Sequence, residues 1–357
     1  MALFILQFIL GLCGIVYGAD KLTDGASAVA RRFNVSTLII GLTIVAFGTS
    51  MPEFVVSTFS AIKGNNEIAI GNVIGSNLFN VLAIVGLIAV ISPLYCERQV
   101  FRRDIPVNIA VSLLLLVFVF FFDDGNMIIN RWEGILLLVV FAIYLAITIS
   151  TAISQSRSYS QPNVGNEAVA ADSKTVDEIV PSAAKSTKSV KSADSSEKTD
   201  SSEKSPMQMW KAILLIIIGL ALLIVGGDQL VDGASGIAQQ MGVSQSVIAL
   251  TIVAIGTSLP ELATSVVAAH KGDNDMAIGN VVGSNIFNIL FILGASATIA
   301  PMNTGNIKTI DFIAFFASAF ILWLSCANSR RLRVNRFEGA FMLLCIITYY
   351  VYVVMQA

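Results

Sequence analysis

Charged and metal-binding residues are scarce in this chain. Only 13% of its 357 residues are charged, and it has one histidine and four cysteines. The 22 basic residues are balanced by 24 acidic ones, so no basic excess predicts a nucleic-acid partner. His270 has no second histidine or cysteine nearby, which argues against a transition-metal site. Since Cys13, Cys96, Cys326 and Cys345 lack disulfide or metal-ligand spacing, we expect small buried apolar residues.

Long apolar segments make up most of the remaining sequence. Hydrophobic residues account for 55% of the chain, and ten stretches approach or exceed the roughly 18 residues that a membrane-spanning helix needs. A transmembrane barrel would instead show segments of about ten alternating residues. The sequence therefore predicts an all-α membrane protein with ten transmembrane helices. The expected spans are 2–19, 35–62, 68–95, 105–122, 134–150, 211–227, 243–269, 276–301, 310–327 and 338–356.

The distribution of basic residues predicts how the chain is oriented. No basic residue precedes the first span, and Lys21, Arg31 and Arg32 follow it, so we expect a retained span and not a cleaved signal peptide. With both termini outside the cell, 19 of the 22 basic residues fall on the cytoplasmic side. The exceptions would be Lys63, Arg131 and Lys308. We predict a multi-pass protein of the cell (inner) membrane with a cytoplasmic central loop.

That central loop has a different composition. Residues 151–208 are rich in serine, lysine, alanine and acidic residues and show no apolar periodicity, which predicts a disordered cytoplasmic linker. A regulatory tail that is phosphorylated or binds anionic lipid is the alternative. Residues 1–150 and 209–357 then form two five-helix repeats. Because five is odd, the repeats must cross the membrane in opposite directions, as inverted repeats do.

An internal duplication supports this division. Residues 41–80 align without a gap with residues 249–288, and 25 of the 40 positions are identical. The same offset of 208 relates Asp20 and Asp24 to Asp228 and Asp232. These aspartates are either solvated caps at the membrane surface or groups that attract cations to the two mouths of a pathway.

The duplicated segment contains a carboxylate at membrane depth. Its first motif is Gly-Thr-Ser-Met-Pro-Glu at 48–53 and Gly-Thr-Ser-Leu-Pro-Glu at 256–261. Proline lacks a backbone donor and crowds the carbonyl four residues earlier, so the helix should open beside Glu53 and Glu261. Carboxylates, hydroxyls and loosened carbonyls are hard oxygen ligands, suited to sodium and calcium. Acidic residues inside membranes usually mark transport pathways.

A second motif follows in each repeat. It reads Gly-Asn-Val-Ile-Gly-Ser-Asn-Leu-Phe-Asn at 71–80 and Gly-Asn-Val-Val-Gly-Ser-Asn-Ile-Phe-Asn at 279–288. Ser76 and Asn80 are four residues apart, as are Ser284 and Asn288, so each pair lies on one helical face. The Gly-x-x-x-Gly spacing is more typical of close helix packing than of ligand binding.

The two motifs, each occurring twice, resemble the alpha-repeats of the sodium/calcium exchanger family, within the cation/calcium antiporter superfamily. The resemblance implies a calcium site on Glu53 and Glu261 with the backbone carbonyls of Thr49 and Thr257. It further implies sodium sites and a middle position. The residues implied for these are Ala46, Ser50, Ser76, Ala254, Ser258 and Ser284 for sodium, and Asn80 and Asn288 for the middle position.

The family resemblance also implies a function without enzymatic chemistry, cofactor or obligate protein partner. Sodium and calcium, moving across the lipid bilayer, would compete for the glutamates in an alternating-access antiporter whose first and sixth helices slide across the core. Some relatives carry aspartate where this chain has Asn80 and Asn288, so a potassium requirement is not expected. A calcium/proton antiporter using the same site, a cation channel and an intramembrane hydrolase are the alternatives.

Overall fold

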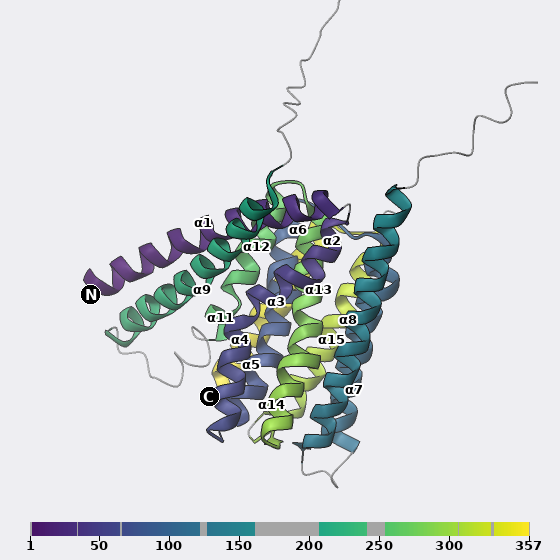
Figure 1. Cartoon of the computed structure of the whole chain (residues 1–357). Helices are drawn as coiled ribbons and strands as arrows, with labels where there is room; N and C mark the ends of the chain where they lie inside the picture. Colours follow the sequence, from purple (N-terminus) through teal and green to yellow (C-terminus); the bar gives the residue numbers. More distant parts are fainter. Residues whose placement is uncertain are drawn as a thin grey trace, which may run out of the picture.

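The computed structural model describes residues 2–33, 35–64, 66–121, 127–160, 207–240, 254–305, 307–329 and 332–356, and most of them are helical (Figure 1). Labels with η denote π-helical segments, which are wider than an α-helix. The elements before the central loop are α1 (Ala2–Phe33), α2 (Thr37–Ile40), η1 (Gly41–Val45), α3 (Ala46–Thr49), α4 (Met51–Ile62), α5 (Asn66–Leu78), η2 (Phe79–Val85), α6 (Gly86–Ile91), β1 (Leu94–Tyr95), η3 (Val100–Asp104), α7 (Ile105–Phe121), β2 (Ile128–Ile129) and α8 (Arg131–Ser160). Those after it are α9 (Met209–Gln240), α11 (Ala254–Thr257), α12 (Leu259–His270), α13 (Asn274–Phe287), η6 (Asn288–Leu293), α14 (Gly294–Ile299), β3 (Met302–Asn303), α15 (Thr309–Ala327), β4 (Arg333–Val334) and α16 (Arg336–Gln356).

Eight helices in the described part of the chain are long and apolar enough to cross a membrane. The bent pair Thr37–Thr49 and Met51–Ile62 raises the number to nine. The fold is thus that of a mostly helical membrane protein. The expected seventh span, 243–269, lies partly outside the described residues. Helix α8 continues to Ser160, past the boundary expected at residue 150, and residues 161–206 of the expected linker lie outside the described residues.

Two helices form the centre of the bundle. In Asn274–Ile299, 94% of the most apolar stretch is buried, and in Ile68–Ile91 the buried share is 72%. The corresponding share is only 17% in Arg336–Met355 and 22% in Arg131–Ser154. The outer helices therefore present apolar side chains outward, as a lipid-facing helix must, while the central helices carry the polar repeated motifs.

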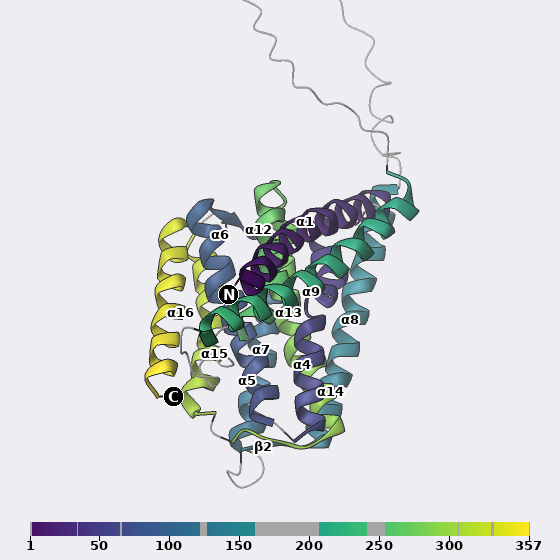
Figure 2. The ribbon, with the colours of Figure 1, turned by 90° about the vertical axis from the view of Figure 1, so that its left-hand side faces the viewer.

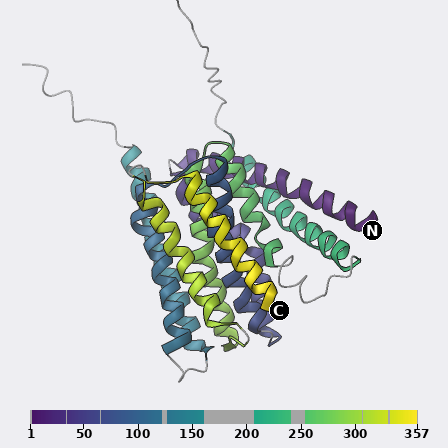
Figure 3. The same cartoon turned by 180° about the vertical axis from the view of Figure 1, so that it is seen from behind.

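Helices α1 and α9 form a separate pair that is inclined to the bundle. Figures 1 and 3 show them side by side and leaving the core obliquely, and Figure 2 shows both crossing in front of the central helices. Glycines bring the two backbones together: a Cβ atom at Gly219 would lie 2.8 Å from the Gly18 carbonyl oxygen. This close packing makes α1 and α9 one unit, which contacts the core chiefly through α12.

Two short antiparallel ribbons connect the loops of the two halves. Strand β1 pairs with β4 through Leu94 and Val334, and β2 pairs with β3 through Ile129 and Met302. All four of these side chains are fully buried. Pairing of β1 with β4 and of β2 with β3 therefore connects the first half of the core to the second at both ends of the bundle.

Candidate ion-binding site

Each half of the core contains a broken helix beside a buried glutamate. In the first half, α3 ends at Thr49, α4 begins at Met51, and the two segments meet at a bend of 48°. Pro52 lies at the second residue of α4, where a missing backbone donor costs little. The predicted opening of this helix is therefore confirmed. It creates a helix N-terminus whose dipole favours the negative charge of Glu53 in the first turn.

The second half repeats this arrangement, with one difference. Helix α11 ends at Thr257 and α12 begins at Leu259 with proline at its second position. The backbone N–H of Ser50 donates to the Ala46 carbonyl, whereas that of Ser258 donates to the Ile255 carbonyl. The Ala254 carbonyl is left out of this bond, so the two expected alanine ligands lie in different local geometry.

Glu53 and Glu261 are completely buried, and each receives a hydrogen bond from the other half. Ser258 Oγ donates to Glu53 Oε1 at 2.9 Å, and Ser50 Oγ donates to Glu261 Oε1 at 2.7 Å. Ser284 Oγ lies 3.5 Å from the same Glu261 oxygen. The structure thus brings both glutamates and three of the expected serines into one cluster at the contact between the halves.

Several buried oxygen atoms in this region have no hydrogen-bond partner among the described residues. They are Oε2 of Glu53, Oε2 of Glu261, Oγ of Ser76, and Oδ1 of Asn80 and Asn288. Burying a polar atom without a partner is costly. Because carboxylate and amide oxygens can only accept, a cation satisfies them where a further acceptor would not. This donor set fits hard cations such as sodium and calcium.

Four asparagines connect the two central helices across the contact between the halves. Asn80 Nδ2 donates to Asn285 Oδ1 at 3.2 Å, and Asn288 Nδ2 donates to Asn77 Oδ1 at 3.1 Å. Asn285 Nδ2 also donates to the Asn77 carbonyl at 3.4 Å. The amide donors of Asn80 and Asn288 are thus used between the halves, which leaves their carbonyl oxygens for an ion.

Sequence reasoning missed a second symmetric pair, Asn72 and Asn280. Both are buried, and both touch the threonine that the family resemblance gave as a calcium ligand in the opposite half. Thr257 Oγ1 lies 3.2 Å from Asn72 Oδ1, and Thr49 Oγ1 lies 3.2 Å from Asn280 Oδ1. A signal for them was present in the sequence, because Asn72 and Asn280 are identical positions of the duplicated segment.

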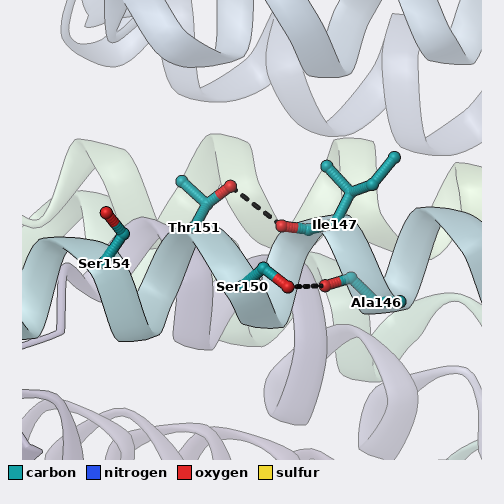
Figure 4. A pocket seen from close by; sticks show the side chains of 5 residues that line it. All are labelled: Ala146, Ile147, Ser150, Thr151 and Ser154. Atoms are coloured by element: carbon teal, nitrogen blue, oxygen red, sulfur yellow. Dashed lines mark hydrogen bonds between the residues drawn. The ribbon is translucent and has the colours of Figure 1, made fainter.

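A polar hollow elsewhere in the described residues does not offer such a ligand set. A hollow on α8 is lined by Ala146, Ile147, Ser150, Thr151 and Ser154 (Figure 4). The hydroxyls of Ser150 and Thr151 donate to carbonyls of their own helix, so they are already satisfied. Within the described ranges, no three histidine, cysteine, aspartate or glutamate side chains are grouped so that they could hold a metal ion. The cluster around Glu53 and Glu261 is therefore the candidate site.

The family model for sodium/calcium exchanger proteins matches residues 3–150 and 211–357. The chain belongs to the sodium/calcium exchanger family. Among its relatives, sodium/calcium exchanger MaX1 of Methanosarcina acetivorans is 32% identical over 351 residues, which cover 97% of each chain. Inner membrane protein YrbG of Escherichia coli is 34% identical over 293 residues, or 82% of this chain and 79% of that protein.

A solved structure of the sodium-calcium exchanger NCX_Mj, soaked with 10 mM Na+ and 10 mM Sr2+, has the same fold as this exchanger-family chain. The TM-score is 0.75 at 28% identity, over 98% of both chains. The predicted family is thus confirmed. The chain is an integral membrane protein and belongs to a transporter family that exchanges sodium and calcium.

Proposed function

We propose that this protein exchanges sodium for calcium through one site built on Glu53 and Glu261. One observation carries the proposal: two fully buried carboxylates, one from each half, each keep an oxygen without a donor among the described residues. Such a pair is costly unless a proton or a cation compensates its charge. The site's function would be to supply that compensation with transported ions.

Charge counting favours competition between the two ions. Two carboxylates carry two negative charges, which one calcium ion or two to three sodium ions would compensate. Calcium takes about six to eight oxygen ligands in flexible geometry. We assign it to Glu53 and Glu261 with the backbone carbonyls of Thr49 and Thr257.

The remaining expected ligands would serve sodium and the middle position. Ser50, Ser76 and the Ala46 carbonyl supply oxygens from the first half, and Ser258, Ser284 and the Ala254 carbonyl are their counterparts in the second. Asn80 and Asn288 lie between them and are neutral. The two glutamates are then the only strongly charged ligands, and no potassium requirement is expected.

Transport through this site would use alternating access between two inverted five-helix repeats with ten spans. Ion occupancy must change the relative free energy of the outward and inward states, because equal binding to both states shifts nothing. The α1 and α9 pair would move across the core, and its narrow glycine contact keeps the two helices together. We place the protein in the cell (inner) membrane with both termini outside and the central linker in the cytoplasm.

The test is a counter-ion measurement in proteoliposomes. Vesicles loaded with sodium and diluted into sodium-free medium containing radioactive calcium should accumulate calcium, since outward sodium movement supplies the driving force. Vesicles loaded with potassium at equal concentration are the control and should not. Calcium uptake driven only by a pH gradient would establish calcium/proton exchange instead, and calcium flux that needs no counter-ion would indicate a channel.

A further inference from the structure

Asn72 and Asn280 each hold together parts of both halves. Asn72 Nδ2 donates to the Glu53 carbonyl at 3.3 Å and to Ser57 Oγ at 3.0 Å, both in its own half. Its Oδ1 lies 3.2 Å from Thr257 Oγ1 in the other half. One amide therefore connects the helix that bears the first glutamate to the broken turn of the opposite half.

Asn280 makes the same contacts with the halves exchanged. Its Nδ2 donates to the Glu261 carbonyl at 3.3 Å and to Ser265 Oγ at 2.9 Å, and its Oδ1 lies 3.2 Å from Thr49 Oγ1. An amide supplies a donor and an acceptor at once, which this geometry requires. An aspartate would lack the Nδ2 donor, and a leucine would lack both the donor and the acceptor.

We propose that Asn72 and Asn280 are positioning residues that set the distance between the two broken turns. This inference rests on the proposed site. The carbonyl of Thr257 would be kept in place relative to Glu53 by Asn72, and that of Thr49 relative to Glu261 by Asn280. Replacing Asn72 or Asn280 should lower the affinity for ions without preventing folding. A loosened turn weakens a multidentate site before it disrupts the surrounding apolar packing.

A double-mutant cycle tests this proposal. Asn72→Ala and Thr257→Val should each weaken apparent calcium affinity about two- to tenfold, the range for one buried hydrogen bond. The effect of the double variant should be smaller than the two single effects combined, because both substitutions remove the contact between Asn72 and Thr257. Ser57→Ala is the matched control: it removes an Asn72 partner within one half and should change affinity less than Asn72→Ala.

The calcium concentration for half-maximal uptake, measured together with maximal uptake, distinguishes a positioning residue from one that only stabilises the fold. A purely structural role would lower maximal uptake and leave the calcium concentration for half-maximal uptake unchanged, and this result would overturn the proposal. Additive effects of Asn72→Ala and Thr257→Val would overturn it as well. Wild-type protein that fails to exchange sodium for calcium would instead contradict the proposed function.

A different observation concerns the contact between α1 and the core. Lys271, in the turn after α12, lies between two aspartates of α1: its Nζ is 2.6 Å from Asp20 Oδ1 and 2.9 Å from Asp24 Oδ1. Partial burial alone would lower the pKa of Lys271, but hydrogen bonds from Lys271 to Asp20 and Asp24 outweigh it and raise that pKa above its ordinary value. The ion pairs thus attach the inclined pair of helices to the core at this end.

One lysine and two aspartates recur at the 208 offset, where they take part in no ion pair among the described residues. Lys63 follows α4 as Lys271 follows α12, and Asp228 and Asp232 lie on α9 as Asp20 and Asp24 lie on α1. All three side chains are exposed, and the ion pairs formed within the described residues do not include them. Figure 1 shows the C-terminal part of α9 leaving the core. The set formed by Lys271, Asp20 and Asp24 is thus joined by ion pairs, whereas the set formed by Lys63, Asp228 and Asp232 is not joined within the described residues.

We infer that the two sets alternate: Lys271 holds Asp20 and Asp24 in one transport state, and Lys63 holds Asp228 and Asp232 in the other. A movement of α1 and α9 that withdraws one pair of aspartates from its lysine would bring the other pair to the opposite lysine. This inference rests on alternating access. It assigns a function to the two pairs of repeated aspartates: each pair would stabilise one of the two end states of the movement.

Cross-linking tests the alternation directly. In full-length protein whose four cysteines are replaced by alanine, Lys271→Cys with Asp24→Cys and Lys63→Cys with Asp232→Cys provide the two pairs. A short bis-methanethiosulfonate reagent is used, because an ion pair separates backbones further than a disulfide can reach. Both pairs should cross-link, and each link should stop transport until it is reduced. Lys63→Cys with Asp24→Cys is the control and should not cross-link.

Charge removal gives a second measurement. Lys271→Ala and Lys63→Ala should shift the ratio of outward to inward states in opposite directions, by about two- to fivefold for a partly exposed ion pair. Lys211→Ala is the control, since its Nζ lies 5.5 Å from the Trp210 ring and forms no ion pair with an acidic side chain of the described residues. Shifts in the same direction, or no cross-link between positions 63 and 232 in a transporting protein, would overturn the inference. An alternating cross-link without sodium-driven calcium uptake would contradict only the proposed ion exchange.

Discussion

Replacing either Glu53 or Glu261 with glutamine is expected to abolish sodium-driven calcium uptake. The amide has nearly the same shape but no charge, so the site loses half of its negative charge. Its NH2 group also places donors where a cation needs acceptors, and it competes with the serine hydroxyl that now donates to the carboxylate. Uptake should fall to the level of empty vesicles, and calcium binding to purified protein should disappear.

The matched control is Glu133→Gln. Glu133 is as deeply buried as the two site residues, but its Oε2 accepts the Asn130 backbone N–H at the start of α8. This substitution should reduce stability slightly and leave calcium affinity unchanged. Retained transport in Glu53→Gln or Glu261→Gln, at normal protein levels, would refute the site assignment.

The second large effect is expected at the contact between α1 and α9. In Gly219→Ala the new Cβ atom would lie 2.6 Å from the Leu22 backbone nitrogen and 2.8 Å from the Gly18 carbonyl oxygen. Neither is a flexible side-chain atom, so the two helices must separate. Overpacking of this kind costs about 1 to 3 kcal/mol. We expect a lower midpoint of thermal unfolding in detergent and a strong loss of transport.

Gly227→Ala on the same helix is the control. Among the described residues, no atom from outside the adjacent turns of α9 lies within 4 Å of the Cβ position at Gly227. Since alanine favours a helix over glycine by about 1 kcal/mol, this variant should be neutral or slightly more stable. Equal behaviour of the two variants would show that close approach at Gly219 is not required.

Much of the site could be predicted from sequence because polar residues in an apolar chain are conspicuous. The duplication fixed the pairing of Glu53 with Glu261, and proline chemistry explained why the helix beside Glu53 is broken. The family assignment followed from the same two motifs. These features are local, and elementary backbone geometry is enough to interpret them.

Features that depend on contacts between distant segments could not be predicted in this way. Ser50 and Ser258 were expected as sodium ligands, but nothing in their spacing indicates that each donates to the glutamate of the other half. Nothing in the spacing of Asn72 indicates that its partner is Thr257, 185 positions away. The end of α8 was also missed, because polar residues after position 150 can extend a helix beyond the membrane without any apolar pattern.

The π-helical segments of the central helices bear on the ancestry of the protein. A π-turn is wider than an α-turn, and π-helical turns inside α-helices occur frequently at functional sites. Segment η2 ends at Val85, before Gly86, and η6 ends at Leu293, before Gly294, so both wide turns stop at positions 208 apart. A single ancestral segment that already had the wide turn, later doubled with the rest of the repeat, accounts for this shared register. Both halves have since inherited it beside the asparagines of the site.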